Sequence, residues 1–252
     1  MTAGGRLVFE AMGTVVSVLL PSDASGAVAG VPGPVAERVT GAFEELEARF
    51  SLYRAATEGA AVARRDLPMR HASAEYRAVY DLAVDWRART AGAFTPHRPD
   101  GAVDLSGVVK ALAIAAAGDL LDAAGLDGWC VNAGGDVLVR GENGPGRPWV
   151  VGIVDPDDRT SLLSQYTSDG RRRAVATSGT AERGEHVWRT GADATFRQVT
   201  VVADDIVTAD VLATAILAGG RDALARAQDG WPIEVLACGA DGRYWPSPAF
   251  RS

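Results

Sequence analysis

The chain has few cysteines and no long apolar run. Its 252 residues include two cysteines, Cys130 and Cys238, and neither has metal-ligand spacing to another cysteine or to a histidine. Both lie in apolar stretches, as thiols of a reducing compartment commonly do. The chain has no run of about 20 apolar residues, the length that is needed to span a bilayer. No long uncharged segment of the signal-peptide type follows the N-terminus. The sequence therefore predicts a cytoplasmic protein that needs neither disulfides nor a membrane.

Positive charge is also scarce relative to negative charge. The chain contains 25 Lys and Arg residues against 32 Asp and Glu residues, which gives a net charge of −7 at pH 7. Binding to the nucleic-acid backbone requires a cationic surface, so no nucleic-acid partner is expected. The short basic clusters at 64–65 and 171–173 are typical of solvated turns.

The common motifs of nucleotide binding and nucleophilic catalysis are missing as well. No G-x-G-x-x-G follows a strand, and there is neither a Walker A loop nor a G-x-S-x-G elbow. The three histidines, His71, His97 and His186, are too scattered to indicate a zinc site. Chemistry on a nucleotide or a phosphate would therefore require a different arrangement of residues.

Hydrophobic periodicity predicts helices mostly early in the chain and strands later. Apolar residues at helical spacing predict helices that begin at Pro34 and near Ser73, and a third helix over 107–124. Apolar and β-branched segments predict strands over 7–10, 15–20, 129–132, 137–140, 149–154, 174–177, 199–203, 233–236 and 243–245. Two further helices are expected at 209–217 and 221–227. With no repeat and no long linker, this order predicts a single domain over 1–252 of the α+β class, in which mixed β-sheets are packed with helices.

Three glycine-containing segments could bind a ligand, although each has a plain structural explanation. Residues 11–14 (AMGT) fit an ordinary turn between two strands. Residues 104–110 (DLSGVVK) enter a helix, where backbone N–H groups favour anions and Lys110 adds a charge. By spacing alone, a helix cap and a lysine at the surface explain this segment better. The paired glycines of 131–136 (VNAGGD) allow close approach to a ligand, and they equally make a hairpin.

Asp210 and Thr214 form the fourth candidate. Residues four apart share one face of a helix, so the carboxylate and the hydroxyl could point together at a hard cation, which prefers oxygen ligands. Magnesium suits a pyrophosphate substrate because it neutralises charge on the phosphate oxygens. By spacing alone, a capping Asp and an ordinary helical Thr remain the better explanation.

Taken in order along the chain, these segments resemble the ApbE family, the FAD:protein FMN transferases. The motifs that carry the resemblance are AMGT at 11–14, FSLY at 50–53, GAF at 92–94, DLSGVVK at 104–110, VNAGGD at 131–136, TSG at 177–179 and ADVLAT at 209–214. They extend over most of the chain. The resemblance implies magnesium-dependent cleavage of FAD, transfer of FMN through a phosphoester to a Thr or Ser hydroxyl of a flavoprotein acceptor, and release of AMP.

The resemblance also implies roles for particular residues. Asp210 and Thr214 are expected as side-chain ligands of magnesium, and a backbone carbonyl near Gly107 as a further ligand. His186 is expected as the base that takes the proton from the acceptor hydroxyl. The expected walls of the FAD site are Met12, Gly13, Thr14, Tyr53, Asp104, Lys110, Gly134, Gly135, Asp136, Ser178 and Gly179.

Several positions depart from the family pattern. Ala63 stands where the family has Asn, and Thr95 and Ala115 stand where it has Asp. Ala111 replaces the Gly after the lysine, and the motif around His186 lacks its Asp-Pro. These changes fall on the FAD pocket and the acceptor side more than on the predicted helix 209–217, which carries the expected metal ligands Asp210 and Thr214. They leave two alternatives open: hydrolysis of FAD to FMN and AMP, or a flavin-binding protein without turnover.

Overall fold

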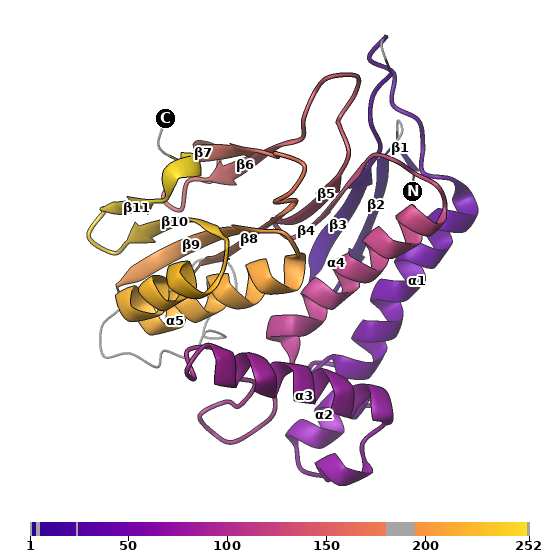
Figure 1. The fold of residues 1–252 in the computed structure, drawn as a ribbon. Coiled ribbons are helices and arrows are strands. Elements are labelled where there is room, and N and C mark those ends of the chain that lie inside the picture. The colour runs from indigo at the N-terminus through magenta and orange to yellow at the C-terminus, as the bar shows by residue number, and fades with distance from the viewer. Residues whose placement is uncertain (1, 4–5, 24, 180–194, 251–252) are drawn as a thin grey trace.

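A central antiparallel sheet organises the chain (Figure 1). The computed structural model describes residues 2–3, 6–23, 25–179 and 195–250. Within them the sheet has nine strands, in the order β1 (Thr2–Ala3), β2 (Arg6–Ala11), β3 (Thr14–Leu19), β4 (Trp129–Ala133), β5 (Asp136–Arg140), β8 (Ala174–Gly179), β9 (Phe196–Ala203), β10 (Glu234–Gly239) and β11 (Tyr244–Pro246). A separate hairpin of β6 (Val150–Val154) and β7 (Leu162–Thr167) lies over the second half of this sheet.

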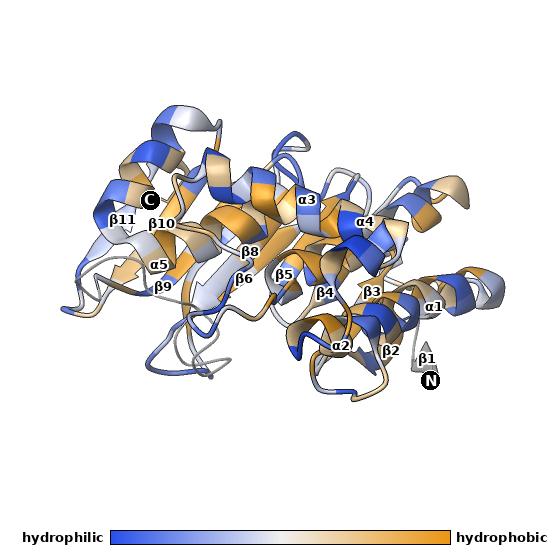
Figure 2. Cartoon of the chain, turned by 90° about the horizontal axis from the view of Figure 1, so that it is seen from below, coloured by the Kyte–Doolittle hydropathy of each residue, from blue (hydrophilic) through white to orange (hydrophobic). Residues whose placement is uncertain are grey.

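The long helices lie on the other face of the sheet. In chain order the helices are α1 (Gly33–Phe50), α2 (Glu58–Ala63), α3 (Ala74–Arg89), α4 (Ser106–Ala123) and α5 (Ile206–Gly230), with short 3-10 turns at Met69–His71 and Pro248–Phe250. Helix α4 packs against both α1 and α5, and α5 packs along β8 and β9. Figure 2 shows hydrophobic residues concentrated in the strands and on the helical turns next to them. The fold is thus a sheet with helices on one face and a hairpin on the other.

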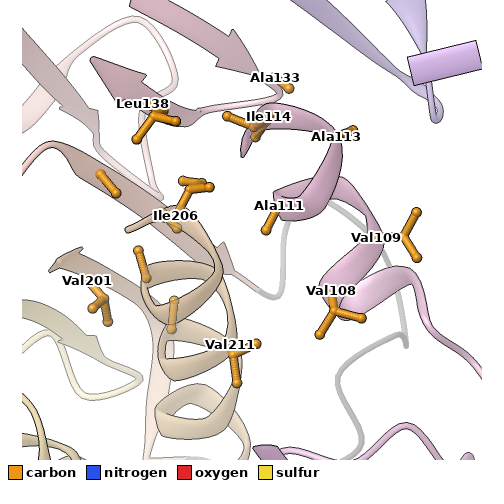
Figure 3. Packing of buried hydrophobic residues seen from close by; sticks show 14 of the residues in the cluster. Val108, Val109, Ala111, Ala113, Ile114, Ala133, Leu138, Val201, Ile206 and Val211 are labelled. Carbon is orange, nitrogen blue, oxygen red and sulfur yellow. The ribbon is translucent and has the colours of Figure 1, made fainter. Parts of the chain in front are cut away.

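The strand residues alternate between two cores, one on each face. Figure 3 shows Ile114 of α4 and Ile206 of α5 in the helix-side core, together with Leu138 of β5. The neighbouring Val137 belongs instead to the hairpin-side core. Because side chains two apart on a strand share a face, Asp136 points to the helix side with Leu138. The same alternation directs Ser178 of β8 toward α5.

The predicted helices and the α+β class are confirmed. Ser73 caps α3, since its hydroxyl accepts the Tyr76 N–H at 3.1 Å. Asp205 caps α5 in the same way by accepting the Thr208 N–H at 2.8 Å. The break expected between two helices after residue 217 is also present, because Gly220 adopts φ 65° and ψ −147° inside α5. Glycine alone adopts such a conformation without strain.

Besides the two-residue β1 and the two 3-10 turns, the sequence-based expectation lacks β7 and α2. Strand β7 exposes half of its six side chains and buries Tyr166 alone, so its apolar alternation is weak. Helix α2 has six residues, too few for a helical period to stand out. Its Gly59 is required by contact, because a Cβ there would lie 2.6 Å from the Phe50 carbonyl oxygen. Both elements depend on tertiary contacts with the rest of the chain.

The two free thiols that the sequence predicts are present where the structure describes the chain. Cys130 and Cys238 are both free and buried. None of the helices in the described ranges has the length and apolar character needed to cross a bilayer.

Candidate functional site

Two tight hairpin turns lie at the same end of the sheet. Met12 and Gly13 connect β2 to β3 with φ values of 52° and 70°. Gly134 and Gly135 connect β4 to β5 with φ values of 62° and 92°. Positive φ at both central positions is the geometry that continues the natural twist of paired strands. The predicted turns are therefore confirmed.

The two turns touch one another through a glycine. Strand β3 pairs with β4, with Val16 opposite Ala133, and the Gly134 N–H donates to the Val15 carbonyl at 3.2 Å. A Cβ on Gly134 would lie 2.5 Å from Thr14 Oγ1. Gly134 thus lets the β4–β5 turn approach the start of β3.

A pocket of about 320 Å³ opens beside the β2–β3 turn. This volume is at the lower end of the roughly 300–1,000 Å³ found for small-molecule sites. The pocket is lined by Met12, Gly13, Leu46, Glu47, Phe50, Ser51, Leu52, Tyr53, Arg54, Asp104, Ser106, Val109 and Lys110. Five of these residues were predicted as walls of the FAD site: Met12, Gly13, Tyr53, Asp104 and Lys110. Tyr53 has 82% of its surface exposed, so its ring is open to a ligand at the mouth.

Buried aromatic side chains support the pocket from behind. The Phe50 ring stacks on Tyr76 with centroids 5.2 Å apart. Burial, followed by the negative charges of Glu58 and Asp104, raises the pKa of the Tyr76 phenol. The phenol therefore stays neutral behind Phe50, an apolar residue of the pocket wall.

The start of α4 forms the opposite wall. The Asp104 carboxylate accepts the Ser106 N–H at 2.9 Å, and the Asp104 N–H donates to the Pro96 carbonyl at 2.8 Å. One residue further on, a Cβ at Gly107 would lie 3.0 Å from the Phe94 ring. Packing therefore explains the glycine, and its predicted part in a metal site stays a prediction.

Lys110 and Asp136 form a buried ion pair that joins α4 to β5. The Asp136 side chain is 0% exposed, and that of Lys110 is 9% exposed at the pocket wall. Asp136 Oδ1 also accepts the Thr177 N–H of β8 at 3.0 Å. The Asp136 carboxylate thus lies behind the pocket wall. It contacts Lys110, which lines the pocket.

Ser178 and Thr214 join β8 to α5. Their hydroxyl oxygens lie 3.1 Å apart, and either group can donate. Asp210 lies one helical turn before Thr214 on the same face and is 5% exposed. The two predicted metal ligands therefore face β8, next to a residue that was predicted for the FAD site.

The donor set around Thr214 suits a hard cation. Asp210 supplies a carboxylate and Thr214 a hydroxyl oxygen, and the Ser178 hydroxyl lies next to that of Thr214. Within the described ranges, no three His, Cys, Asp or Glu residues gather closely enough to hold a metal by themselves. Magnesium is commonly held by one or two carboxylates together with substrate phosphates. The residues fit a magnesium ion, and its remaining ligands would then have to come from a phosphate substrate.

One predicted site residue belongs to a part of the chain that the structure does not describe. His186 falls within 180–194, outside the described residues, and Gly179 ends β8 directly before that segment. Two supporting residues were missed by the sequence reasoning. Asn132 accepts the Gly135 N–H at 3.0 Å, and the buried Thr200 hydroxyl lies 2.8 Å from that of Thr177. Asn132 had a detectable signal, because Asn side chains commonly bond the backbone of a following turn.

A protein-family model matches the part of the chain that contains most of these site residues. The family model described as "ApbE family" matches residues 95–237. The chain belongs to the ApbE family. The match includes Asp104, Lys110, Asp136, Ser178 and Thr214, whereas the first turn and Tyr53 lie before it.

Similar proteins extend the ApbE match. The FAD:protein FMN transferase of Klebsiella pneumoniae (strain 342) is 30% identical over 169 residues, which cover 61% of this chain and 48% of that protein. The aligned part thus amounts to about half the length of this relative. The ApbE protein of Thermotoga maritima superimposes with a TM-score of 0.74 at 20% identity, covering 96% of both chains. The flavin transferase ApbE of Vibrio cholerae gives a TM-score of 0.74 at 21% identity, covering 98% of this chain and 97% of that one. The likeness in fold therefore extends over almost the whole chain, beyond the residues that the family model matches.

Proposed function

We propose that this chain is a magnesium-dependent FAD:protein FMN transferase. It cleaves the pyrophosphate of FAD, attaches FMN through a phosphoester to a Thr or Ser hydroxyl of a flavoprotein, and releases AMP. The observation that carries the proposal is the hydroxyl pair between Ser178 of β8 and Thr214 of α5, the helix that also holds the buried Asp210. Membership of the ApbE family and the names of its matched relatives support the same activity.

The pocket beside α4 suits FAD. Its apolar side chains, among them Met12, Phe50 and Val109, can contact a flat aromatic ring system, and the exposed Tyr53 ring can stack on it. The Lys110 ammonium at the pocket wall favours an anionic phosphate. One pocket thus combines the two chemical characters of a dinucleotide.

The residues of α5 would hold the metal. Asp210 and Thr214 are its proposed side-chain ligands, and a backbone carbonyl near Gly107 is the further proposed ligand. When bound, magnesium neutralises the charge that builds up on the phosphate oxygens. Lys110, held in place by Asp136, adds a fixed positive charge on the FAD side.

The acceptor reaction requires a base. The acceptor hydroxyl oxygen forms a bond to the phosphorus of the FMN half, and the bond from that phosphorus to the bridging oxygen breaks. AMP leaves with the bridging oxygen. His186 is the proposed group that takes the proton from the acceptor hydroxyl, because a neutral imidazole near pH 7 suits that task.

The decisive experiment incubates the protein with FAD and magnesium, with and without a Thr-containing acceptor peptide. Released AMP and peptide-bound flavin fluorescence are measured together. Asp210→Asn should lower AMP release about 100-fold or more, since a bound metal contributes several kcal/mol to such a transition state. Asp222→Asn, an exposed position on the same helix, serves as the matched control and should keep its activity.

Three results would contradict the proposal. Full AMP release by Asp210→Asn would remove that residue from the metal site. AMP with free FMN, even in the presence of the acceptor peptide, would indicate a hydrolase. Unchanged FAD that stays bound to the protein would indicate a flavin-binding protein without turnover.

A further inference from the structure

The sheet opens between β5 and β8 at the site. Within the described strands, β5 pairs with β8 at two positions, Val137 with Val175 and Leu138 with Ala174, whereas β8 pairs with β9 along its whole length. Continuing the first register would set Thr177 opposite Gly135, which lies in the β4–β5 turn. The last residues of β8 therefore have no regular backbone ladder on their β5 side.

The Asp136 side chain closes this opening. Its Oδ1 accepts the Thr177 N–H at 3.0 Å, which is the N–H that a continued ladder would have bonded. Its other oxygen is paired with Lys110 of α4. A buried carboxylate is costly to desolvate, and even a paired one is weak evidence for stability. Its use here is better explained by the geometry that it imposes on β8.

The position of β8 affects the proposed metal ligand Thr214 through one further contact. Ser178 follows Thr177, and its hydroxyl meets that of Thr214 at 3.1 Å. A hydroxyl oxygen that binds a cation must turn its hydrogen away from the ion, so the hydrogen needs an acceptor on the other side. Ser178 Oγ is at the right distance to be that acceptor.

We propose that Asp136 is a positioning residue for the metal helix. By bonding the Thr177 N–H, it holds Ser178 in place to orient the Thr214 hydroxyl. The same carboxylate fixes Lys110 at the pocket wall, so one buried group aligns the metal side and the phosphate side of the site. This inference rests on the proposed function, because it assumes that magnesium binds at Asp210 and Thr214.

The test compares two double variants that carry the same charge. Asp136→Ala alone would leave Lys110 buried without its counter-ion, which endangers folding. Lys110→Met/Asp136→Asn and Lys110→Met/Asp136→Ala avoid that problem. They differ in whether an amide oxygen is available to the Thr177 N–H. Magnesium affinity is measured by calorimetric titration of the FAD-loaded protein, and AMP release is followed separately.

The alanine variant should bind magnesium roughly 10-fold more weakly than the asparagine variant, as is usual when a group that orients a metal ligand is lost. Adding Ser178→Ala to both should remove the difference, because the effect passes through that hydroxyl. Asp222→Asn, an exposed position of α5 outside the site, is the control and should keep the wild-type affinity.

The outcomes separate this inference from the proposed function. Equal magnesium affinity in the two double variants, in a protein whose wild type releases AMP with magnesium, would overturn the role of Asp136 alone. An undiminished difference after Ser178→Ala would overturn the route through Ser178. A wild-type protein that binds no magnesium would overturn both proposals.

Discussion

At the residue scale, Gly134 shows what one missing side chain permits. Its φ is 62°, and a Cβ there would meet Thr14 Oγ1 at 2.5 Å. Its neighbour Gly135 has a similar backbone, with φ 92°, and no described atom lies within 4 Å of a Cβ built there. Gly134 is therefore required both for its backbone conformation and for the space that a Cβ would take, whereas Gly135 is required for its conformation alone.

Gly134→Ala should destabilise the protein more than Gly135→Ala. Each substitution costs about 1–2 kcal/mol for a left-handed backbone, and the first must also displace the Thr14 side chain. We expect the additional loss to be about 1 kcal/mol or more. Urea unfolding of the two variants measures this additional loss. Equal midpoints would show that the Thr14 side chain can move away from the new Cβ without a loss of stability.

The raised pKa of the Cys130 thiol predicts that the protein loses stability at alkaline pH. Burial raises the pKa of its thiol from 9.0 to about 12, and the Arg6 charge opposes this more weakly. Between those values the unfolded chain loses the proton while the folded chain keeps it. Since the folded state then binds more protons, the free energy of unfolding falls as pH rises, by up to about 1.4 kcal/mol per pH unit for this group.

Cys130→Ala removes this group from the titration. The variant should be less stable near neutral pH because a core side chain is shortened, yet its stability should fall less steeply above about pH 9. Unfolding midpoints in urea at several pH values give both slopes. Parallel slopes would mean that the thiol ionises as easily in the folded protein as in the unfolded chain.

At the scale of elements, the β6–β7 hairpin is anchored to the sheet at its tip. Arg197 Nη2 of β9 donates to Asp157 Oδ2 at 2.6 Å, and Arg197 Nε donates to Cys238 Sγ at 3.0 Å. The Asp157 carboxylate and then the Cys238 thiol raise the pKa of the guanidinium. Gln198 adds a bond from its side-chain amide to the Val154 carbonyl at 3.0 Å.

Asp157→Ala should loosen the hairpin locally. The Asp157 side chain is 65% exposed, so solvent screening limits the ion pair to about 0.5–1 kcal/mol. Backbone amides of β6 and β7 should therefore exchange hydrogen roughly 2–5 times faster. The amides of β2 and β3, in the same molecule, are the internal control, and acceleration of all four strands would indicate a global effect instead.

At the scale of the whole molecule, the site draws on elements that are far apart in the chain. The pocket takes residues from the β2–β3 turn, the end of α1 and the start of α4, whereas α5, the helix proposed to hold the metal, follows more than 80 residues later. A ligand that spans them binds the folded state alone. Binding should therefore raise the stability of the whole fold.

FAD and magnesium together should raise the melting temperature. At a free ligand concentration about 100 times the Kd, the gain is about 2.7 kcal/mol, or roughly 5–10 °C for a chain of this size. Either ligand alone should give a smaller shift, and Asp210→Asn should lose the magnesium-dependent part. Scanning calorimetry measures these shifts, and a magnesium effect that persists in the variant would locate the ion elsewhere.

Local features of the fold were predictable because they depend on neighbours in the sequence. Ser73 starts α3, the Met12–Gly13 and Gly134–Gly135 turns join strands, and Gly220 breaks α5. Each of these positions is governed by backbone geometry or by a bond to a residue a few positions away. The order of motifs also led to the ApbE family.

Contacts between distant segments were decided by the tertiary structure. No spacing rule pairs Lys110 with Asp136, or Ser178 with Thr214, because those contacts depend on how α4 and α5 pack against the sheet. The ladder between β5 and β8 ends where the β4–β5 turn begins, so a side chain bonds the Thr177 N–H. The sequence by itself determined where the helices and turns form, whereas the packing of two helices on one face of the sheet determined which of its polar residues meet.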